Sequence, residues 1–190
     1  MNSKDAEYNI LPTNDNNDID FNIQQDKENT DEEHPVSRPT MLLVLGMHRS
    51  GTSIVARLLD CLGAVNSTNV MPSNQDNPKG FFEDLDIYNF NNNILLPALG
   101  IRWHSLGDVD WTLIPAKERS NMALEALAIL RKNYSQANYI SVLKEPRVGM
   151  LLPFWLSVLR HAGYNVKIVC PVRNPASIAK SLEKRNGFHF

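Results

Sequence analysis

The fold of this 190-residue chain is decided by one stretch, Met41-Leu42-Leu43-Val44-Leu45-Gly46-Met47-His48-Arg49-Ser50-Gly51-Thr52-Ser53. Its first five residues are apolar, as expected for a strand that is buried on both faces of a parallel sheet. A short polar loop then runs between two glycines, and a helical pattern follows. Backbone N–H groups at such a strand–loop–helix junction bind phosphate at the helix N-terminus. The stretch therefore predicts an anion-binding loop at one edge of a sheet.

The loop resembles the P-loop pattern G-x-x-x-x-G-K-[ST], with one difference. Thr52 stands where a P-loop has the Lys that reaches the β- and γ-phosphates of ATP, and Arg49 places a cation inside the loop. This arrangement favours a nucleotide with one 5′-phosphate and a single further anionic group over a triphosphate. A P-loop kinase is therefore the weaker alternative.

The charge is unevenly distributed along the chain. Residues 1–40 contain ten acidic and three basic residues, a net charge of −7, whereas the other 150 residues contain eleven acidic and sixteen basic ones, a net charge of +5. The first segment is rich in Asn and Asp and has few large apolar residues, which is typical of disorder. We therefore expect a disordered acidic arm over residues 1–40 and one α/β domain over residues 41–190, with a basic balance that favours anionic ligands.

Composition also argues against several classes of protein. No basic run is interleaved with aromatic residues, no apolar stretch reaches about 18 residues, and no cluster of metal ligands is visible. We therefore expect no nucleic acid, no membrane span and no metal. The arm has neither the apolar run of a signal peptide nor the low acidity of a transit peptide. Cys61 and Cys170 have apolar neighbours and are expected to be buried, reduced thiols of a cytoplasmic protein, with a disulfide as the alternative.

Strands and helices alternate after Pro39. Helices are predicted over 54–62, 81–99, about 16 residues from Pro115, 149–161 and from Asn174 onward, and further strands over 139–143 and 166–172. The apolar residues of the first helix are expected on one face; they are Ile54, Val55, Leu58, Leu59 and Leu62. This order predicts a three-layer α/β fold, a parallel sheet flanked by helices. Because three strands are few for such a domain, we expect the fold to be incomplete at its C-terminus.

Each predicted strand ends in a polar segment that contains a cation. These segments are the loop 46–53, residues 144–147 (Lys-Glu-Pro-Arg) and residues 173–175 (Arg-Asn-Pro). Parallel strands bind ligands beyond their carboxyl ends, which lie at one edge of the sheet. The three segments are therefore expected to form one site.

Two of these segments resemble the 3′-phosphoadenosine-5′-phosphosulfate (PAPS)-dependent sulfotransferases, especially their bacterial carbohydrate-type branch, which has a P-loop NTPase-like fold. Residues 46–53 are similar to that family's 5′-phosphosulfate loop. Residues 172–175 (Val-Arg-Asn-Pro), followed by Ser181, are similar to its 3′-phosphate site. The resemblance covers residues 41–188. It implies PAPS as sulfuryl donor, no metal, and a hydroxyl-bearing acceptor such as a carbohydrate.

The resemblance also implies roles in donor binding. The loop amides and hydroxyls would hold the 5′-phosphate, Arg49 would neutralise charge on the leaving phosphate, and Arg173 would pair with the 3′-phosphate. The Ser181 hydroxyl would add a contact to the 3′-phosphate, and Ser177, one helical turn earlier, is the alternative residue for that contact. His48 is expected to support the loop backbone rather than to transfer protons, and His104 and His161 to be structural. The expected donor-binding set is His48, Arg49, Ser50, Gly51, Thr52, Ser53, Arg173 and Ser181.

The acceptor hydroxyl needs a base. In similar sulfotransferases a glutamate at a position like that of Glu83 takes the proton of the acceptor hydroxyl. Asp84 is the alternative base in this chain. An acidic residue in the first turn of a helix also stabilises the helix dipole, which is the alternative role of Glu83. Lys144 and Arg147 look like the family's Lys-Asp-Pro-Arg segment, with Glu145 in place of Asp. They would orient acceptor or sulfate, or pair with Glu145. The expected catalytic residues are Glu83, Arg49 and Lys144.

Two further expectations stay open at this stage. Trp103, Trp111 and Phe82 are expected to pack in the core, with stacking on a sugar ring as the alternative. Sulfotransferases of this kind continue well beyond residue 190, so a truncated, non-catalytic remnant that binds nucleotide weakly is a second interpretation of the whole chain.

Overall fold

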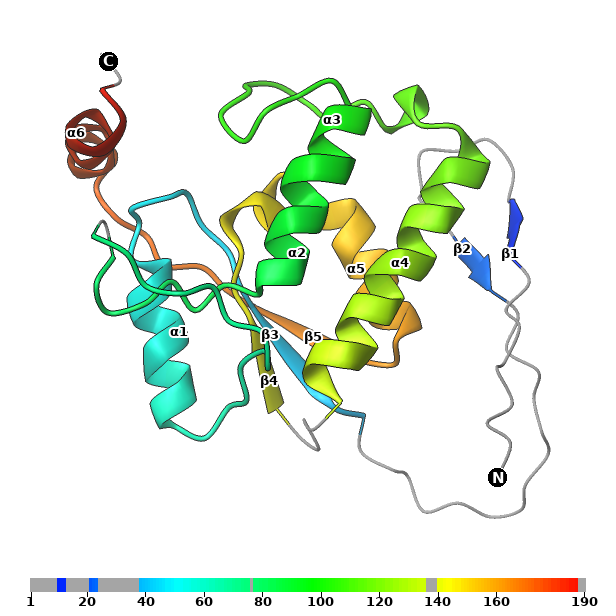
Figure 1. Ribbon diagram of the computed structural model, residues 1–190, viewed down its shortest axis with the longest axis horizontal. Coiled ribbons are helices and arrows are strands. Elements are labelled where there is room, and N and C mark those ends of the chain that lie inside the picture. The colour runs from blue at the N-terminus through cyan, green and yellow to red at the C-terminus, as the bar shows by residue number, and fades with distance from the viewer. Residues whose placement is uncertain (1–9, 13–20, 24–37, 76, 136–139, 188–190) are drawn as a thin grey trace.

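The computed structural model describes residues 10–12, 21–23, 38–75, 77–135 and 140–187. Within them, three parallel strands form a sheet in the order β4–β3–β5. The central strand β3 (Thr40–Val44) pairs with β4 (Ile140–Leu143) on one side and with β5 (Asn165–Val169) on the other. Helices flank this sheet (Figure 1). The predicted α/β class, a parallel sheet flanked by helices, is confirmed.

The helical elements follow the alternation expected from the sequence. They are α1 (Thr52–Cys61), α2 (Leu85–Phe90), the π-helical turn η1 (Asn91–Leu95), α3 (Leu96–Ala98), the 3₁₀ turn η2 (Trp111–Leu113), α4 (Ala116–Tyr134), the 3₁₀ turn η3 (Pro146–Gly149), α5 (Leu152–His161) and α6 (Pro175–Asn186). In Figure 1, α4 and α5 lie on one side of the sheet and α1 on the other, while α6 stands apart from both.

β3 is central because both of its faces are apolar. Side chains alternate between the faces of a strand. Met41 and Leu43 join a large core with residues of α4 and α5, and Leu42 and Val44 join a smaller core with residues of α1. Met41, Leu43 and Val44 are completely buried. The strand that carries the loop is therefore held from both faces.

Helix α1 packs on the sheet through only part of the predicted apolar face. Val55 and Leu59 are partly buried against the smaller core. Ile54, Leu58 and Leu62 are 67%, 58% and 83% exposed and do not pack there. The buried residues of this helix are Thr52 and Ala56. The loop sets the rotation of the helix by placing Thr52 inward, and one turn later the small Ala56 faces the sheet.

The helix predicted over 81–99 begins four residues late. α2 starts at Leu85, and the side chain of Asp84 caps it by accepting a hydrogen bond from the N–H of Ile87 at 2.9 Å. Phe82 has a φ of +56°, which is incompatible with a right-handed helix. Glu83 therefore precedes the helix instead of opening it, and the alternative role of its carboxylate in the helix dipole is wrong.

Other boundaries differ less. β5 ends at Val169, so the predicted strand over 166–172 is too long. The helix predicted over 149–161 begins at Leu152, as α5, while Gly149 is the last residue of η3. The last helix starts as expected: the side chain of Asn174 accepts a hydrogen bond from the N–H of Ala176 at 2.9 Å, and Pro175 is the first helical residue. Tyr139, the first residue of the strand predicted over 139–143, lies outside the described residues.

Most of the arm expected to be disordered, residues 1–40, lies outside the described residues. The structure describes two short strands there, β1 (Ile10–Pro12) and β2 (Phe21–Ile23). They pair antiparallel, with Ile10 opposite Ile23.

Both cysteines are free, and both are exposed, so their predicted burial is wrong. Cys61 is the last residue of α1, whose outer side is open. Cys170 directly follows β5, a strand at the edge of the sheet. Apolar neighbours along the chain do not bury a residue whose element is covered on only one side.

We predict that both thiols react with Ellman's reagent in the native protein, because both are exposed to solvent in the folded state. Two equivalents of thiol should be released before denaturant is added, and Cys61→Ser and Cys170→Ser should each remove one. Release of either thiol only after denaturation would contradict its exposed position.

Candidate functional site

A cavity of about 570 Å³ opens at the carboxyl ends of the three strands. The polar segments that follow the strands meet there. Arg49 comes from the loop after β3, Lys144 and Arg147 come from the segment after β4, and Arg173 comes from the segment after β5. The sheet thus brings three distant parts of the sequence into one site.

The cavity is strongly cationic. Among the described residues that line it are five cations and one carboxylate, that of Glu83; the cations are Arg49, Lys144, Arg147, Arg173 and Arg185. A cleft lined by charges of one sign concentrates ligands of the opposite sign. The chemistry of this lining fits a ligand with several negative charges.

The loop after β3 makes its turn at Gly46, which has a φ of +155°. A Cβ atom at this position would lie 2.8 Å from the Oγ of Ser50. That Oγ is buried and has no hydrogen-bond partner. Ser50 therefore fills the space beneath the turn. Its side chain does not line the cavity, whereas a role in donor binding was expected for it.

The N-terminus of α1 opens onto the cavity. The N-cap residue of α1 is Gly51, which has a left-handed conformation, so no side chain caps the N–H groups of the first turn. Thr52 and Ser53, the first two residues of the helix, line the cavity. The first N–H groups of a helix lack partners within the helix and, with its dipole, attract anions. The Ser53 hydroxyl accepts hydrogen bonds from Lys144 Nζ and from Asn77 Nδ2, each at 3.3 Å. Asn77 was not among the residues predicted for the site, and it lies in the Asn-Pro-Lys-Gly segment of residues 77–80.

Arg49, Arg173 and Ser181 are in direct contact. Arg49 Nε donates a hydrogen bond to Ser181 Oγ at 2.9 Å, and Arg173 Nη1 donates one to the carbonyl oxygen of Arg49 at 2.7 Å, across 132 and 124 residues of sequence. Ser177, the alternative to Ser181, is exposed. Arg185, one turn beyond Ser181 on α6, also lines the cavity. The i, i+4 spacing from Ser181 was a signal that could have identified it.

Glu83 and Lys144 form a buried ion pair in the cavity wall. The two residues are 5% and 3% exposed, and Lys144 Nζ contacts the Glu83 carboxylate directly. Lys144 also donates to the carbonyl oxygen of Phe81 at 3.1 Å. Lys144 thus pairs with Glu83 rather than with Glu145, and it links the candidate base to Ser53 at the start of α1.

Arg147 is the residue that pairs with Glu145. Its Nη1 lies 2.6 Å from Glu145 Oε1, and its guanidinium lies 4.5 Å from the centre of the Tyr88 ring. Asn91 Nδ2 donates to Glu145 Oε2 at 2.7 Å, and Trp155 Nε1 donates to Asn91 Oδ1 at 2.9 Å. Burial raises the pKa of Glu145, which the charge of Arg147 partly offsets. Asn91 begins the π-helical turn η1, a feature common near functional sites.

Of the three aromatic residues considered for sugar stacking, only Trp103 lines the cavity. Its ring meets that of His48 edge-on, with 4.8 Å between the ring centres. Trp111 stacks on Phe154 in the large core, 6.1 Å apart, and Phe82 packs against the smaller core.

His48 belongs to the loop after β3 and lines the cavity. Burial lowers its pKa to about 3, and the positive charges of Arg147, Arg185, Lys144 and Arg49 add to this effect. Its Nε2 atom is buried without a hydrogen-bond partner. The imidazole therefore stays neutral at physiological pH. The other two histidines expected to be structural differ: His161 is half-buried in α5, whereas His104 is exposed and meets Trp103 edge-on.

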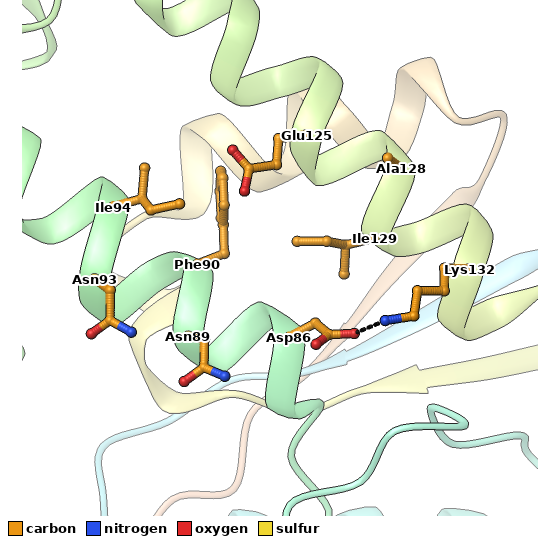
Figure 2. A pocket seen from close by; sticks show the side chains of 9 residues that line it. All are labelled: Asp86, Asn89, Phe90, Asn93, Ile94, Glu125, Ala128, Ile129 and Lys132. Atoms are coloured by element: carbon orange, nitrogen blue, oxygen red, sulfur yellow. Dashed lines mark hydrogen bonds and ion pairs between the residues drawn. The ribbon is translucent and has the colours of Figure 1, made fainter.

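A second hollow of about 410 Å³ lies between α2 and α4 (Figure 2). Lys132 and Asp86 point toward one another at its edge and form an ion pair at 2.9 Å, and Phe90 and Ile129 contribute apolar surface. Its described lining contains two carboxylates, Asp86 and Glu125, against the single cation Lys132, and it contains none of the residues expected at a site. The cationic cavity is therefore the candidate functional site.

Comparison with known proteins leaves the function to be argued from this geometry, because no family model, no curated protein and no solved structure matches the chain. Among the described residues, no group of three His, Cys, Asp or Glu side chains is placed to hold a metal ion. In the same part of the chain, no helix is both long enough and apolar enough to cross a membrane.

His48 should make the protein sensitive to acid. Its folded-state pKa of about 3 lies below the usual value of 6.5, so between these values the unfolded chain binds a proton that the folded protein does not. The stability associated with neutral His48 is therefore lost as the pH falls from 6.5 toward 3.

The wild-type protein should lose free energy of unfolding between about pH 7 and about pH 4.5. We predict that the His48→Gln variant loses less than the wild type, by on the order of 2 kcal/mol. Urea denaturation at the two pH values measures this loss. His161→Gln is the matched control and should have a smaller effect, because His161 is less buried. A wild-type His48 NMR resonance that titrates near pH 6.5 would contradict the prediction.

Proposed function

We propose that this chain has a P-loop-like sulfotransferase fold and transfers a sulfuryl group from PAPS to a hydroxyl of a saccharide or small-molecule acceptor. The observation that carries the proposal is the contact of Arg49 with both Arg173 and Ser181. These residues come from the two motifs that resemble the donor site of that family. The contact joins them at one cationic cavity, which also contains the ion pair of Glu83 and Lys144.

The donor would lie along the carboxyl edge of the sheet. Its 5′-phosphosulfate would be held by the N–H groups at the start of α1 and by Arg49, in the middle of the edge. Its 3′-phosphate would pair with Arg173 on the β5 side, where a guanidinium can make two parallel hydrogen bonds. Ser181 supports this arrangement by fixing Arg49.

The transfer step needs a base and a stabilised leaving group. The acceptor oxygen attacks sulfur, the new S–O bond forms in line with the bond that breaks, and the bridging oxygen leaves with 3′,5′-ADP. Glu83 would take the proton of the acceptor hydroxyl. Lys144 touches both Glu83 and Ser53, so it would stabilise negative charge on the sulfuryl oxygens, and Arg49 would stabilise charge on the leaving phosphate.

The cytoplasm is the proposed location. Two exposed, free thiols are suited to a reducing compartment. A non-catalytic remnant and a P-loop kinase are the alternatives. The remnant would bind 3′,5′-ADP without turning over PAPS. The kinase would bind ATP in a Mg²⁺-dependent manner, with Lys144 near Ser53 in place of the missing loop lysine.

We predict that Arg173→Ala weakens binding of 3′,5′-ADP by about 10- to 100-fold, since a charge-assisted pair with the 3′-phosphate is lost. Isothermal titration calorimetry measures the affinity. Two controls are matched: Arg160→Ala removes an exposed arginine of α5, and 5′-AMP lacks the 3′-phosphate. Equal losses for 3′,5′-ADP and 5′-AMP would show that Arg173 does not recognise the 3′-phosphate, and wild-type protein that binds neither would refute the donor site.

We also predict that Glu83→Gln lowers the rate of 3′,5′-ADP release from PAPS, with a panel of saccharides as acceptors, by at least about 100-fold. Affinity for 3′,5′-ADP should be retained, because the amide preserves the shape of Glu83 and Lys144 keeps the Phe81 carbonyl as a partner. Asp84→Asn is the control, since Asp84 caps α2 and should affect stability instead. Wild-type protein that binds 3′,5′-ADP but never turns over PAPS would favour the remnant.

A further inference from the structure

The cavity has a cationic corner that the donor, as placed above, leaves unused. This corner is formed by Arg147, which follows β4, whereas Arg173 follows β5. The two strands lie on opposite sides of β3, so their ends are about 10 Å apart at a strand spacing of nearly 5 Å. The loop that would hold the sulfuryl group lies between them. Arg147 is thus on the far side of the reacting group from the 3′-phosphate.

Arg147 is held in one orientation. Its Nη1 contacts Glu145 Oε1 at 2.6 Å, its own N–H donates to Glu145 Oε2 at 3.1 Å, and its guanidinium lies over Tyr88. Asn91 Nδ2 donates a further hydrogen bond to Glu145 Oε2 and so holds the same carboxylate. Glu145 is completely buried, while Arg147 is 7% exposed and lines the cavity. The cavity is therefore lined by the guanidinium and not by the carboxylate that balances it.

Two polar atoms at this corner lack partners. Arg147 Nε and His48 Nε2 are both buried without a hydrogen bond, and both residues line the cavity. After burial, the charge of Arg147 is the largest cause that lowers the pKa of His48. A buried polar atom without a hydrogen-bond partner destabilises the folded protein. Two of them at one corner, beside a cation, indicate a place for a group with acceptor oxygens.

We propose that Arg147 and His48 bind a carboxylate of the acceptor, and that the acceptor is an acidic saccharide containing a uronic acid unit. A carboxylate at the Nε edge of Arg147 would provide the missing acceptor, and a neutral His48 can donate from Nε2 to the same group. Trp103 lines the same cavity and provides aromatic surface for a sugar ring. The hydroxyl of that ring would face Glu83.

This inference rests on the proposed function, and binding can be measured separately from turnover. The probes are methyl β-D-glucuronide and methyl β-D-glucoside, which differ only in the carboxylate, at equal ionic strength and with 3′,5′-ADP bound. Fluorescence of Trp103 reports binding, and Trp103→Phe shows which part of the signal is local. We expect at least about tenfold tighter binding of the glucuronide, equivalent to about 1.4 kcal/mol.

Arg147→Met would leave Glu145 as a buried, unpaired carboxylate and could unfold the protein. The test variant is therefore Arg147→Met combined with Glu145→Gln, with Glu145→Gln alone as its control. We expect the double variant to bring the preference for glucuronide over glucoside to within about twofold, and Arg147→Lys to retain part of it. Where PAPS is turned over, the loss should appear in the KM for the glucuronide rather than in kcat.

The outcomes distinguish the two proposals. Wild-type protein that does not bind 3′,5′-ADP refutes the proposed function, and the inference with it. Binding of 3′,5′-ADP without preference for the glucuronide overturns the inference alone. It is also overturned if the double variant loses affinity for 3′,5′-ADP, since Arg147 would then serve the donor, or if N-acetyl-Glu-Tyr-amide binds more tightly than the glucuronide, since the acceptor would then be an acidic peptide.

Discussion

The central position of β3 is the constraint on which the rest of the structure depends. It pairs with β4 on one side and β5 on the other, and all three strands are parallel. Their carboxyl ends consequently share one edge, with the loop of β3 between the segments that follow its neighbours. This order places Arg49 in the middle, Arg173 at one end and Arg147 at the other. Donor and acceptor would approach the reacting group from opposite ends of the same edge.

Holding this many charges together requires specific pairing. Glu83 with Lys144 and Glu145 with Arg147 are buried ion pairs, and loss of one member of such a pair costs about 3–5 kcal/mol because the other is left unpaired. The backbone is also strained at two positions, because Arg49 and Phe82 adopt left-handed conformations with φ values of +70° and +56°. Such conformations persist where the surrounding structure imposes them, often at functional sites. Arg49 is itself part of the proposed chemistry, and Phe82 directly precedes Glu83.

Much of the site could be predicted from the sequence, for reasons that concern particular residues. Arg173 and Ser181 were identified by their motif and contact Arg49 as a consequence of the strand order. The network behind Arg147 could not be predicted, because Asn91 belongs to a run of three asparagines that carries no signal, and its orientation depends on a π-helical turn. The position of Glu83 ahead of its helix was missed as well, since the positive φ of Phe82 has no signature in the sequence.

The sequence by itself determined the alternation of apolar strands and helices, the glycine-bracketed loop and the polar segments at the strand ends, because these depend on local backbone preferences and on periodicity. Only the tertiary structure decided which side chains meet. It turned Ile54 and Leu58 outward, exposed Cys61, and paired Lys144 with Glu83 rather than with its neighbour Glu145. These outcomes depend on the rotation of α1 and on the order of the strands, which arise from packing between segments far apart in the chain.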